Sequence, residues 1–250
     1  MFGTSIHETL QHYLTVMYDT SGANADREDL VGYFESKYRL HYKKEYIKNN
    51  NKHFTTPEQM LEFFEDGVNI INHFQKNKSK YFSIKGWNLA AIELPLILVP
   101  NKQFPNVKYV GYLDIVMYHE ETNTFHIIDL KTSTSGWKKS DKENEEKQFQ
   151  LILYKQFFST LFNIDKSKIN VEFIILRRKV YTEGDFPQKP IQIFVPPTGP
   201  SKINKALTSL NTFIESCFGN DIVDFTPNPS KWNCVFCPFL NTEHCKNGIS

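Results

Sequence analysis

Gly111-Tyr-Leu-Asp114 and Ile128-Asp129-Leu130-Lys131 are the two stretches that decide the fold of this chain. Both are rich in apolar residues and read as β-strands. Because side chains alternate along a strand, Asp129 and Lys131 should point to the same side of the sheet. Burying an unpaired polar group costs about 2 to 7 kcal/mol even when it is neutral. A divalent cation shared by Asp114 and Asp129, with Lys131 beside the reacting group, would offset this cost.

The rest of the chain supplies helices and further strands around these two segments. Apolar spacing of 3.6 residues predicts helices, and alternating or β-rich runs predict strands. Helices are expected at 4–18, about 27–40, 57–76, 143–162 and about 201–218, and strands at 89–99, 109–118, 124–132, 171–178 and 191–195. A polar loop is expected at 132–141. This order predicts an α/β domain with a mixed central sheet flanked by helices.

Composition narrows the class of protein. The 250 residues include 21 Phe, 12 Tyr and 3 Trp, enough for one packed core. The net charge of +1 neither requires nor excludes a polyanionic partner. No run reaches the roughly 18 apolar residues that a membrane span needs, and the N-terminus lacks a secretory pattern. An intracellular, cytoplasmic protein is expected, or one in the host-cell cytoplasm if the chain is viral.

Five short motifs follow one another along the chain. They are Gly3-Thr-Ser-Ile-His7, Ile92-Glu93-Leu94, Gly111-Tyr-Leu-Asp114, Asp129-Leu-Lys131 and Gln150-Leu-Ile-Leu-Tyr154. In type and order they resemble the G-x-x-x-H, strand carboxylate, G-x-x-D, D-x-K and Q-x-x-x-Y motifs of the RecB-like family within the PD-(D/E)XK nuclease superfamily. The resemblance runs from residue 3 to about 178. It implies a restriction-endonuclease-like core at 1–216, a helical insert at about 19–85, and a Cys-rich tail at 217–250 packed on that core.

The resemblance implies a Mg²⁺- or Mn²⁺-dependent phosphodiesterase. Asp114 and Asp129 offer the oxygen ligands that these ions prefer. His7 would add a nitrogen ligand, which favours Mn²⁺ and other first-row metals. Glu93 and the backbone carbonyl of Leu130 would be further ligands.

Three other side chains complete the expected catalytic set. Lys131 would orient or deprotonate the attacking water, or stabilise charge on the phosphate, and the sequence does not separate these roles. Gln150 and Tyr154, at i and i+4 on one helix face, belong to the same set by resemblance.

Each residue taken alone has a simpler interpretation. His7 is then a hydrogen-bonded, half-buried histidine, and Asp129 with Lys131 an ion pair at a sheet edge. Glu93 can face solvent, and Gln150 with Tyr154 can form a polar helix flank. The nuclease interpretation rests on the whole set occurring in order.

The loop after Lys131 carries candidate nucleic-acid contacts. Hydroxyls of Thr132 and Ser133 can hold phosphates beside the scissile one, and Trp137 at the loop tip can stack on a base. Arg177, on the face of its strand shared with Phe173, can reach the nucleic acid. The alternative for Thr132, Ser133 and Trp137 is an ordinary flexible polar loop, and the alternative for Arg177 is a solvated surface charge.

Cys234-Val-Phe-Cys237 and Cys245, with His244 adjacent, have the spacing of a zinc or iron–sulfur site. The trio is similar to the C-terminal cysteines of AddB-type and CRISPR-associated exonucleases, which hold a [4Fe–4S] cluster with one upstream cysteine. No cysteine precedes Cys217 here. The outcomes are a cluster completed by Cys217, a Zn²⁺ site completed by His244, or no metal. The apolar stripe that contains Cys217 favours a core thiol.

The function expected from these observations is a metal-dependent DNA nuclease, an exonuclease by resemblance, that acts in DNA recombination, repair or replication. Its partner would be single-stranded or end-bearing duplex DNA. No G-x-x-x-x-G-K-[ST] loop occurs, so unwinding would need a helicase or recombination partner. The alternative is a non-catalytic nucleic-acid-binding subunit of a larger recombination complex.

Overall fold

The computed structural model describes residues 1–181, 183, 185, 187–219, 229–235, 237–246 and 248–249. The α-helices in this part are α1 (Phe2–Asp19), α2 (Gly22–Ala25), α3 (Leu30–Lys48), α4 (Pro57–Asn77), α5 (Lys139–Glu143), α6 (Glu145–Phe162), α7 (Pro200–Phe218) and α8 (Lys231–Cys234). The strands are β1 (Trp87–Leu98), β2 (Tyr109–His119), β3 (Thr124–Ser133), β4 (Ile169–Arg177) and β5 (Ile191–Phe194). Two 3₁₀ turns, η1 (Lys78–Lys80) and η2 (Lys166–Lys168), complete the set.

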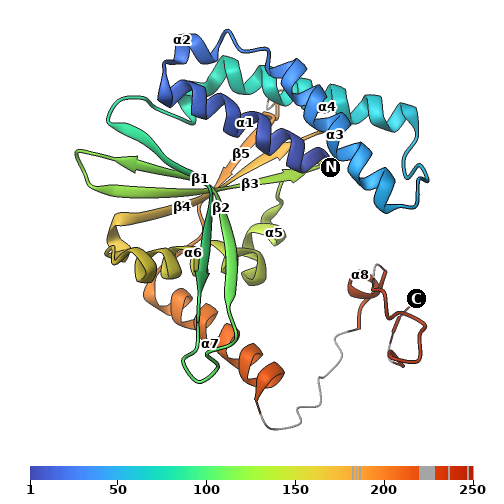
Figure 1. Ribbon diagram of the computed structural model, residues 1–250, viewed down its shortest axis with the longest axis vertical. Helices are drawn as coiled ribbons and strands as arrows, with labels where there is room; N and C mark the ends of the chain where they lie inside the picture. The colour runs from blue at the N-terminus through green and yellow to red at the C-terminus, as the bar shows by residue number, and fades with distance from the viewer. Residues whose placement is uncertain are drawn as a thin grey trace.

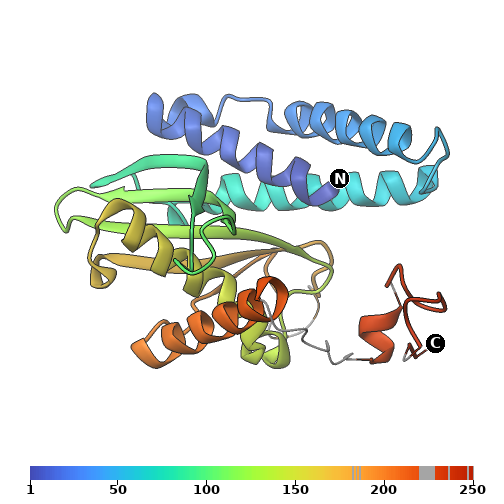
Figure 2. The same ribbon diagram turned by 60° about the horizontal axis from the view of Figure 1, so that its bottom comes forward.

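The five strands form one sheet in the order β1-β2-β3-β4-β5. Strands β3 and β4 run parallel, and the other neighbours are antiparallel. Helices α1, α3 and α4 cover one face of the sheet, and α6 and α7 lie on the other (Figures 1 and 2). The predicted α/β domain with a mixed central sheet is therefore confirmed.

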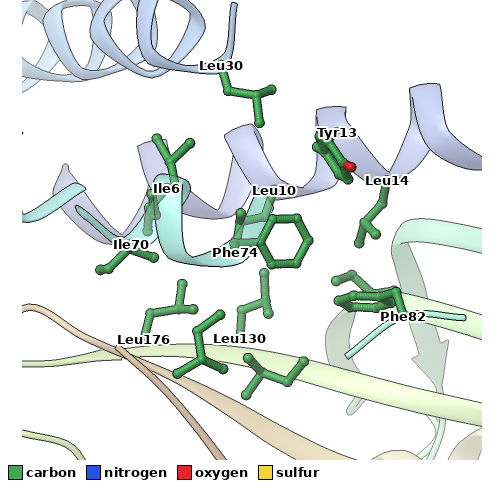
Figure 3. Close-up of a cluster of buried hydrophobic side chains, with 14 of the residues drawn as sticks. Ile6, Leu10, Tyr13, Leu14, Leu30, Ile70, Phe74, Phe82, Leu130 and Leu176 are labelled. Atoms are coloured by element: carbon green, nitrogen blue, oxygen red, sulfur yellow. The ribbon is translucent and has the colours of Figure 1, made fainter. Parts of the chain in front are cut away.

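The larger core lies between the sheet and the layer of α1, α3 and α4. Figure 3 shows how α1 and α4 meet the sheet, through side chains that include Ile6, Leu10, Phe74, Leu130 and Leu176. Leu10 and Ile6 recur at helical spacing on one side of α1, so the stripe read from the sequence is the buried one. Each fully buried apolar side chain contributes about 1.5 to 3 kcal/mol. This packing fixes α1 across the ends of the central strands.

Helices α3 and α6 differ from their predicted bounds, and α5 was not predicted. Helix α3 begins at Leu30, because the side chain of Asp29 accepts a hydrogen bond from the Gly32 N–H at 2.9 Å and caps it. It continues to Lys48, well beyond the expected end, although its last turns bury little apolar surface. Helix α5 lies within the region expected to be a polar loop, and α6 begins at Glu145, capped by Asn144.

Strands β2 and β3 separate in the middle of the sheet. Their pairing ends at Ile115 and Ile128, whereas β3 stays paired with β4 as far as Ser133. Leu113 and Ile115 belong to the cores on opposite faces, although residues two apart in a regular strand face the same way. Strand β2 therefore turns over at Asp114, which leaves a gap beside β3.

Strand β1 has an irregular backbone at Glu93, opposite Asp114 of β2. Glu93 has a φ of 50°, in the left-handed region that non-glycine residues seldom adopt. The regular pairs Ile92–Ile115 and Leu94–Leu113 flank it. Such strain tends to occur at functional sites.

The end of the chain carries α8 and a series of turns. In both views these segments lie apart from the sheet and its helices (Figures 1 and 2). The packing of a 217–250 tail on a 1–216 domain stays a prediction, as does the status of residues 19–85 as an insert. In the described part of the chain, no helix combines the length and apolar character needed to cross a membrane.

Glu172 is a buried acid that lies outside the gap between β2 and β3, and its ionisation tests how strongly the core excludes charge. Glu172 on β4 lies with its carboxylate 3.5 Å from Nε2 of His126 on β3. Burial raises the pKa of Glu172 from 4.5 to about 7 and lowers that of His126 to about 4. The folded state thus binds the Glu172 proton more tightly than the unfolded state does, and ionisation of Glu172 costs stability as pH rises from 4.5 to 7.

We expect Glu172→Gln to stabilise the protein at pH 8 and to have much less effect at pH 5. A pKa shift of this size corresponds to roughly 3 kcal/mol in the free energy of unfolding at pH 8. Urea unfolding of both proteins at the two pH values measures it. An equal difference between variant and wild type at pH 5 and pH 8 would contradict the raised pKa, because Glu172 would then be ionised in the folded core already at pH 5.

Candidate active site

A cavity of about 560 Å³ lies where β2 and β3 separate. Helix α1 forms one wall, and the middle strands form the other. The residues that line it are Gly3, Thr4, His7, Glu8 and Gln11 of α1, Glu93 of β1, Asp114 of β2, and Leu130, Lys131 and Thr132 of β3. Four of the five motifs contribute residues to this lining, and the Gln150–Tyr154 motif does not.

Two glycines allow the surrounding elements to come close. A Cβ atom on Gly3 would lie 3.1 Å from Oγ1 of Thr132, so glycine lets the first turn of α1 rest on the end of β3. A Cβ atom on Gly111 would lie 2.7 Å from Cε1 of Tyr154, which brings α6 against β2. The glycines of the first and third motifs are thus needed for close packing around the cavity.

Asp114 spans the gap between the two strands. Its Oδ2 accepts a hydrogen bond of 2.7 Å from the backbone N–H of Leu130, in place of a strand-to-strand bond. Burial and, after it, the negative charge of Asp129 together raise the pKa of Asp114 to about 7. The two carboxylates therefore lie close enough to repel each other, and a cation between them would relieve this repulsion.

Asp129 lies at the centre of a small network. It is 2% exposed, and its Oδ2 is 2.8 Å from Nζ of Lys131, so both side chains do point to the same side of β3. Nε2 of Gln150 donates to Oδ1 of Asp129 at 2.9 Å and to the hydroxyl of Tyr154 at 3.0 Å. Burial raises the pKa of Asp129 although Lys131 opposes this.

His7 faces Asp114 across the cavity. Its Nδ1 is 3.8 Å from Oδ2 of Asp114, and its buried Nε2 has no hydrogen-bond partner in the described part of the chain. Burial lowers the pKa of His7 to about 4, and the charge of Lys131 contributes. The ring is therefore neutral at pH 7, the form in which histidine binds metals.

The donor set fits a divalent cation. It combines a neutral imidazole that has an unpartnered buried nitrogen with two carboxylates whose pKa values are raised. Such a mixture of nitrogen and oxygen ligands suits Mn²⁺ and also admits Mg²⁺. Among the described residues, no three His, Cys, Asp or Glu side chains are already gathered at coordination distance. The coordination by His7, Asp114 and Asp129 accordingly stays a prediction.

Glu93 points into the cavity rather than to solvent alone. Its Oε1 accepts a 2.7 Å hydrogen bond from Nε2 of Gln11, and its charge raises the pKa values of Asp114 and Asp129. The left-handed backbone at Glu93 directs the carboxylate toward α1. The backbone N–H of Leu130 is engaged by Asp114, and its carbonyl stays a predicted ligand.

Gln11 is the site residue that the sequence interpretation missed. Its amide donates both to Glu93 and, at 3.1 Å, to the backbone carbonyl of Asp114, and only 5% of the residue is exposed. It thereby links α1, β1 and β2 at the strand gap. Its position four residues after His7, on the same side of α1, was the available signal.

Replacing Gln11 should weaken metal binding without removing a ligand. Residues that orient metal ligands typically contribute 10- to 100-fold to affinity, so we expect Gln11→Ala to raise the Mn²⁺ dissociation constant by roughly 10-fold. Calorimetric titration measures this. Gln156→Ala on α6 is the matched control, because among the described residues the amide of Gln156 bonds only to Thr160. Equal affinities in the two variants would assign Gln11 a packing role only.

The expected nucleic-acid contacts divide into two groups. Thr132 lines the cavity and remains a candidate. The hydroxyl of Ser133 is instead engaged with the backbone of Gly136, accepting at 3.1 Å and donating at 3.2 Å. Its role in holding phosphates therefore stays a prediction that needs this turn to open.

Trp137 does not lie free at a loop tip. Its ring centroid is 4.8 Å from that of Phe173 and 5.9 Å from that of Phe194, and Lys147 lies over its face. Its backbone also exchanges two hydrogen bonds with the side chain of Gln192. The ring is therefore packed against β4 and β5 and partly buried, and its stacking on a base stays a prediction.

Arg177 is partly buried at the end of β4, opposite Ser133. Burial lowers the pKa of its guanidinium, and the buried Nε has no hydrogen-bond partner within the described residues. The residue does not line the cavity, so a contact with nucleic acid stays a prediction for Arg177.

The four cysteines are free thiols. Cys234 is buried and accepts a weak hydrogen bond from the Ile249 N–H at 3.5 Å, whereas Cys237 and Cys245 are partly buried. Cys217 is also only partly buried on α7, so the expected core position holds in part. His244 is exposed beside Glu243. A cluster or zinc ion at these residues has no support from the described side-chain geometry.

Comparison with known proteins agrees with this arrangement. A sequence model of the PD-(D/E)XK nuclease superfamily matches residues 1–242, which include every strand and all the cavity-lining residues. No curated protein matches the chain. Because the match covers nearly the whole sequence, the chain belongs to the PD-(D/E)XK nuclease superfamily.

Proposed function

We propose that this protein is a divalent-metal-dependent deoxyribonuclease that hydrolyses phosphodiester bonds at the cavity between α1 and the parted strands. One observation carries the proposal. The buried carboxylate of Asp129 is bonded to Lys131 beside Asp114, where a separation of strands opens the sheet to a cavity. Buried carboxylates with raised pKa values at an open cavity are typical of functional sites.

In the proposed reaction, water attacks phosphorus, the bond from phosphorus to the leaving oxygen breaks, and that oxygen takes up a proton. A bound Mg²⁺ or Mn²⁺ would supply Lewis-acid activation and charge neutralisation. His7, Asp114 and Asp129 would hold the ion, with Glu93 beside them. The ammonium of Lys131 would stabilise negative charge on the phosphate, and Gln150 would fix the orientation of Asp129. The hydroxyl of Thr132 lies at the edge where a neighbouring phosphate would pass.

We also propose action from DNA ends, as in RecB-like exonucleases, within recombination, repair or replication. Support for this finer assignment comes from the order and spacing of the five motifs, and a helicase partner would supply unwinding. At the tail, the C-x-x-C spacing supports a zinc or iron–sulfur site at Cys234, Cys237 and Cys245. Metal analysis and the visible absorption spectrum of freshly purified protein would separate these two metals.

The test of the nuclease is cleavage of end-labelled linear DNA and closed circular DNA, each single- and double-stranded. The reactions contain Mg²⁺, Mn²⁺ or a chelator. We expect metal-dependent release of short products from linear DNA and little cleavage of circles. Cleavage that persists in chelator would reject the metal mechanism. Tight DNA binding without cleavage under every metal condition would favour the non-catalytic subunit.

A further inference from the structure

We infer that the projecting end of α3 is a binding track for single-stranded DNA that leads away from the catalytic cavity. This inference rests on the proposed function and adds to it a class of substrate. In both views the turn between α3 and α4 projects beyond the N-terminus (Figures 1 and 2). Strand β3, which has Lys131 near its C-terminal end, points toward the same side of the molecule. A strand leaving the cavity on this side would pass along α3.

The side of α3 nearest the cavity carries a basic ridge, which consists of Lys37, His41, Lys44 and Lys48. These positions recur at intervals of three and four residues, so they lie along one side of the helix. The ridge begins at the cavity wall, because Lys37 and His41 contact the carboxylate of Glu8 at 3.1 and 2.9 Å. Glu8 itself lines the cavity.

The charges of this segment are not balanced by acids. Between residues 37 and 53 the sequence has six Lys or Arg and a single acid, Glu45. Lys43, Lys44 and Lys52 are exposed and form no ion pair with any residue in the described part of the chain. Lys37 and Lys48 of the ridge are paired with Glu8 and Glu45, so Lys43, Lys44 and Lys52 carry the uncompensated positive charge. Such charge is complementary to a nucleic-acid backbone.

Aromatic rings gather where the ridge ends. The rings of Tyr42 and Phe54 are 5.1 Å apart between centroids, and those of Tyr46 and His53 are 4.9 Å apart. Phe54 is 44% exposed. A groove of about 560 Å³ lies against Tyr42 and His53, with Arg39 at its edge. An exposed cluster of this kind offers stacking surfaces for unpaired bases.

The ridge and the rings are on different sides of α3. At 3.6 residues per turn, Tyr42 and Tyr46 face away from Lys44 and Lys48, and the 49–54 turn leads round the end of the helix between them. Because a helix is about 10 to 12 Å across with its side chains, the two groups are within reach of a short strand. Stacking requires unpaired bases, so the track should favour single strands over duplex.

The test is the affinity for a fluorescein-labelled 20-nucleotide oligothymidylate and for a duplex of equal length, measured by fluorescence anisotropy in chelator. The Asp129→Asn chain is used throughout, so that cleavage does not interfere. We expect Lys44→Glu/Lys48→Glu to weaken single-strand binding at least 10-fold. The slope of log affinity against log salt should fall by about 0.7 for each lost phosphate contact.

The ring cluster is tested in the same assay. Phe54→Ala should weaken single-strand binding roughly 10-fold, whereas Phe54→Trp should retain it, because stacking needs only an aromatic face. Lys166→Glu/Lys168→Glu, in η2 at the opposite end of the sheet beside the start of β4, is the charge-matched control for the lysine double variant and should bind as the parent does. Thermal unfolding confirms that each variant is folded.

Two results would overturn the track. One is unchanged affinity and salt slope in the Lys44→Glu/Lys48→Glu variant, and the other is equal weakening by Lys166→Glu/Lys168→Glu. Hydrolysis of bis-p-nitrophenyl phosphate by the wild-type protein, which needs no flanking bases, measures the proposed function separately. Failure of that reaction with normal anisotropy results would refute the nuclease assignment and leave the track intact.

Discussion

Asp129→Asn should lower metal-dependent DNA cleavage by about 1000-fold in kcat and should leave the free energy of unfolding equal to or above that of the wild type. Asparagine keeps the size of the side chain and an oxygen that can accept the 2.9 Å bond from Gln150. The variant removes a buried negative charge whose pKa is raised by burial. Activity should therefore fall while stability does not. This is expected where a catalytic group, here the buried carboxylate of Asp129, lowers the stability of the folded protein.

The matched control is Asp165→Asn at the opposite end of the sheet. Asp165 caps η2 through Ser167, and asparagine is an equally good cap, so neither cleavage nor stability should change. Initial rates in Mg²⁺ and in Mn²⁺ measure the first effect, and urea unfolding at pH 8 measures the second. If Asp129→Asn cleaved DNA within 10-fold of wild type, Asp129 would be a structural residue only.

Gly67→Ala should lower the melting temperature although alanine is the better helix former. Gly67 lies inside α4, where a Cβ atom would overlap the ring of Phe34, a fully buried residue of α3. Helix propensity favours alanine by about 1 kcal/mol, and overpacking a core usually costs 1 to 3 kcal/mol. Because the ring of Phe34 is also stacked between Tyr38 and Phe64, we expect a net loss of roughly 2 kcal/mol, with the clash outweighing propensity.

A double-mutant cycle separates this clash from other causes. Phe34→Leu removes ring atoms next to Gly67, so Gly67→Ala should cost much less in that background, where the gain in helix propensity remains. Gly22→Ala is the control, because its Cβ would meet Ile84 at an ordinary 3.6 Å. A loss of stability on Gly67→Ala that is unchanged by Phe34→Leu would contradict the packing described for α3 and α4.

Much of the fold could be predicted because its signals are local. The β-rich apolar runs of β2 and β3 and the apolar stripes of α1 and α4 follow from neighbouring residues alone. Asp129 and Lys131 fall on one side of β3 for the same reason. The full length of α3 was not predictable in this way, because its last turns carry charged and half-exposed aromatic residues with no apolar stripe.

The surroundings of Gln11 and Trp137 could not be predicted, because they depend on contacts distant in sequence. Gln11 gains its role only because α1 crosses β1 at Glu93, 82 residues away. Trp137 is packed because β5 returns beside β4 and supplies Phe194 and Gln192. The spacing of Gln11 from His7 places the two on one side of α1 but does not reveal the contact with Glu93, and the residues around Trp137 give no sign of β5. The turning over of β2 at Asp114, which creates the cavity, is likewise visible only in the paired strands.

Binding of Mn²⁺, followed by electron paramagnetic resonance at pH 8, tests the central claim most directly. The wild type should bind the ion, Asp114→Asn and Asp129→Asn should each weaken binding at least 10-fold, and Asp165→Asn should bind as the wild type does. Wild-type affinity in both site variants would contradict the claim that carboxylates from the two parted strands hold a catalytic cation.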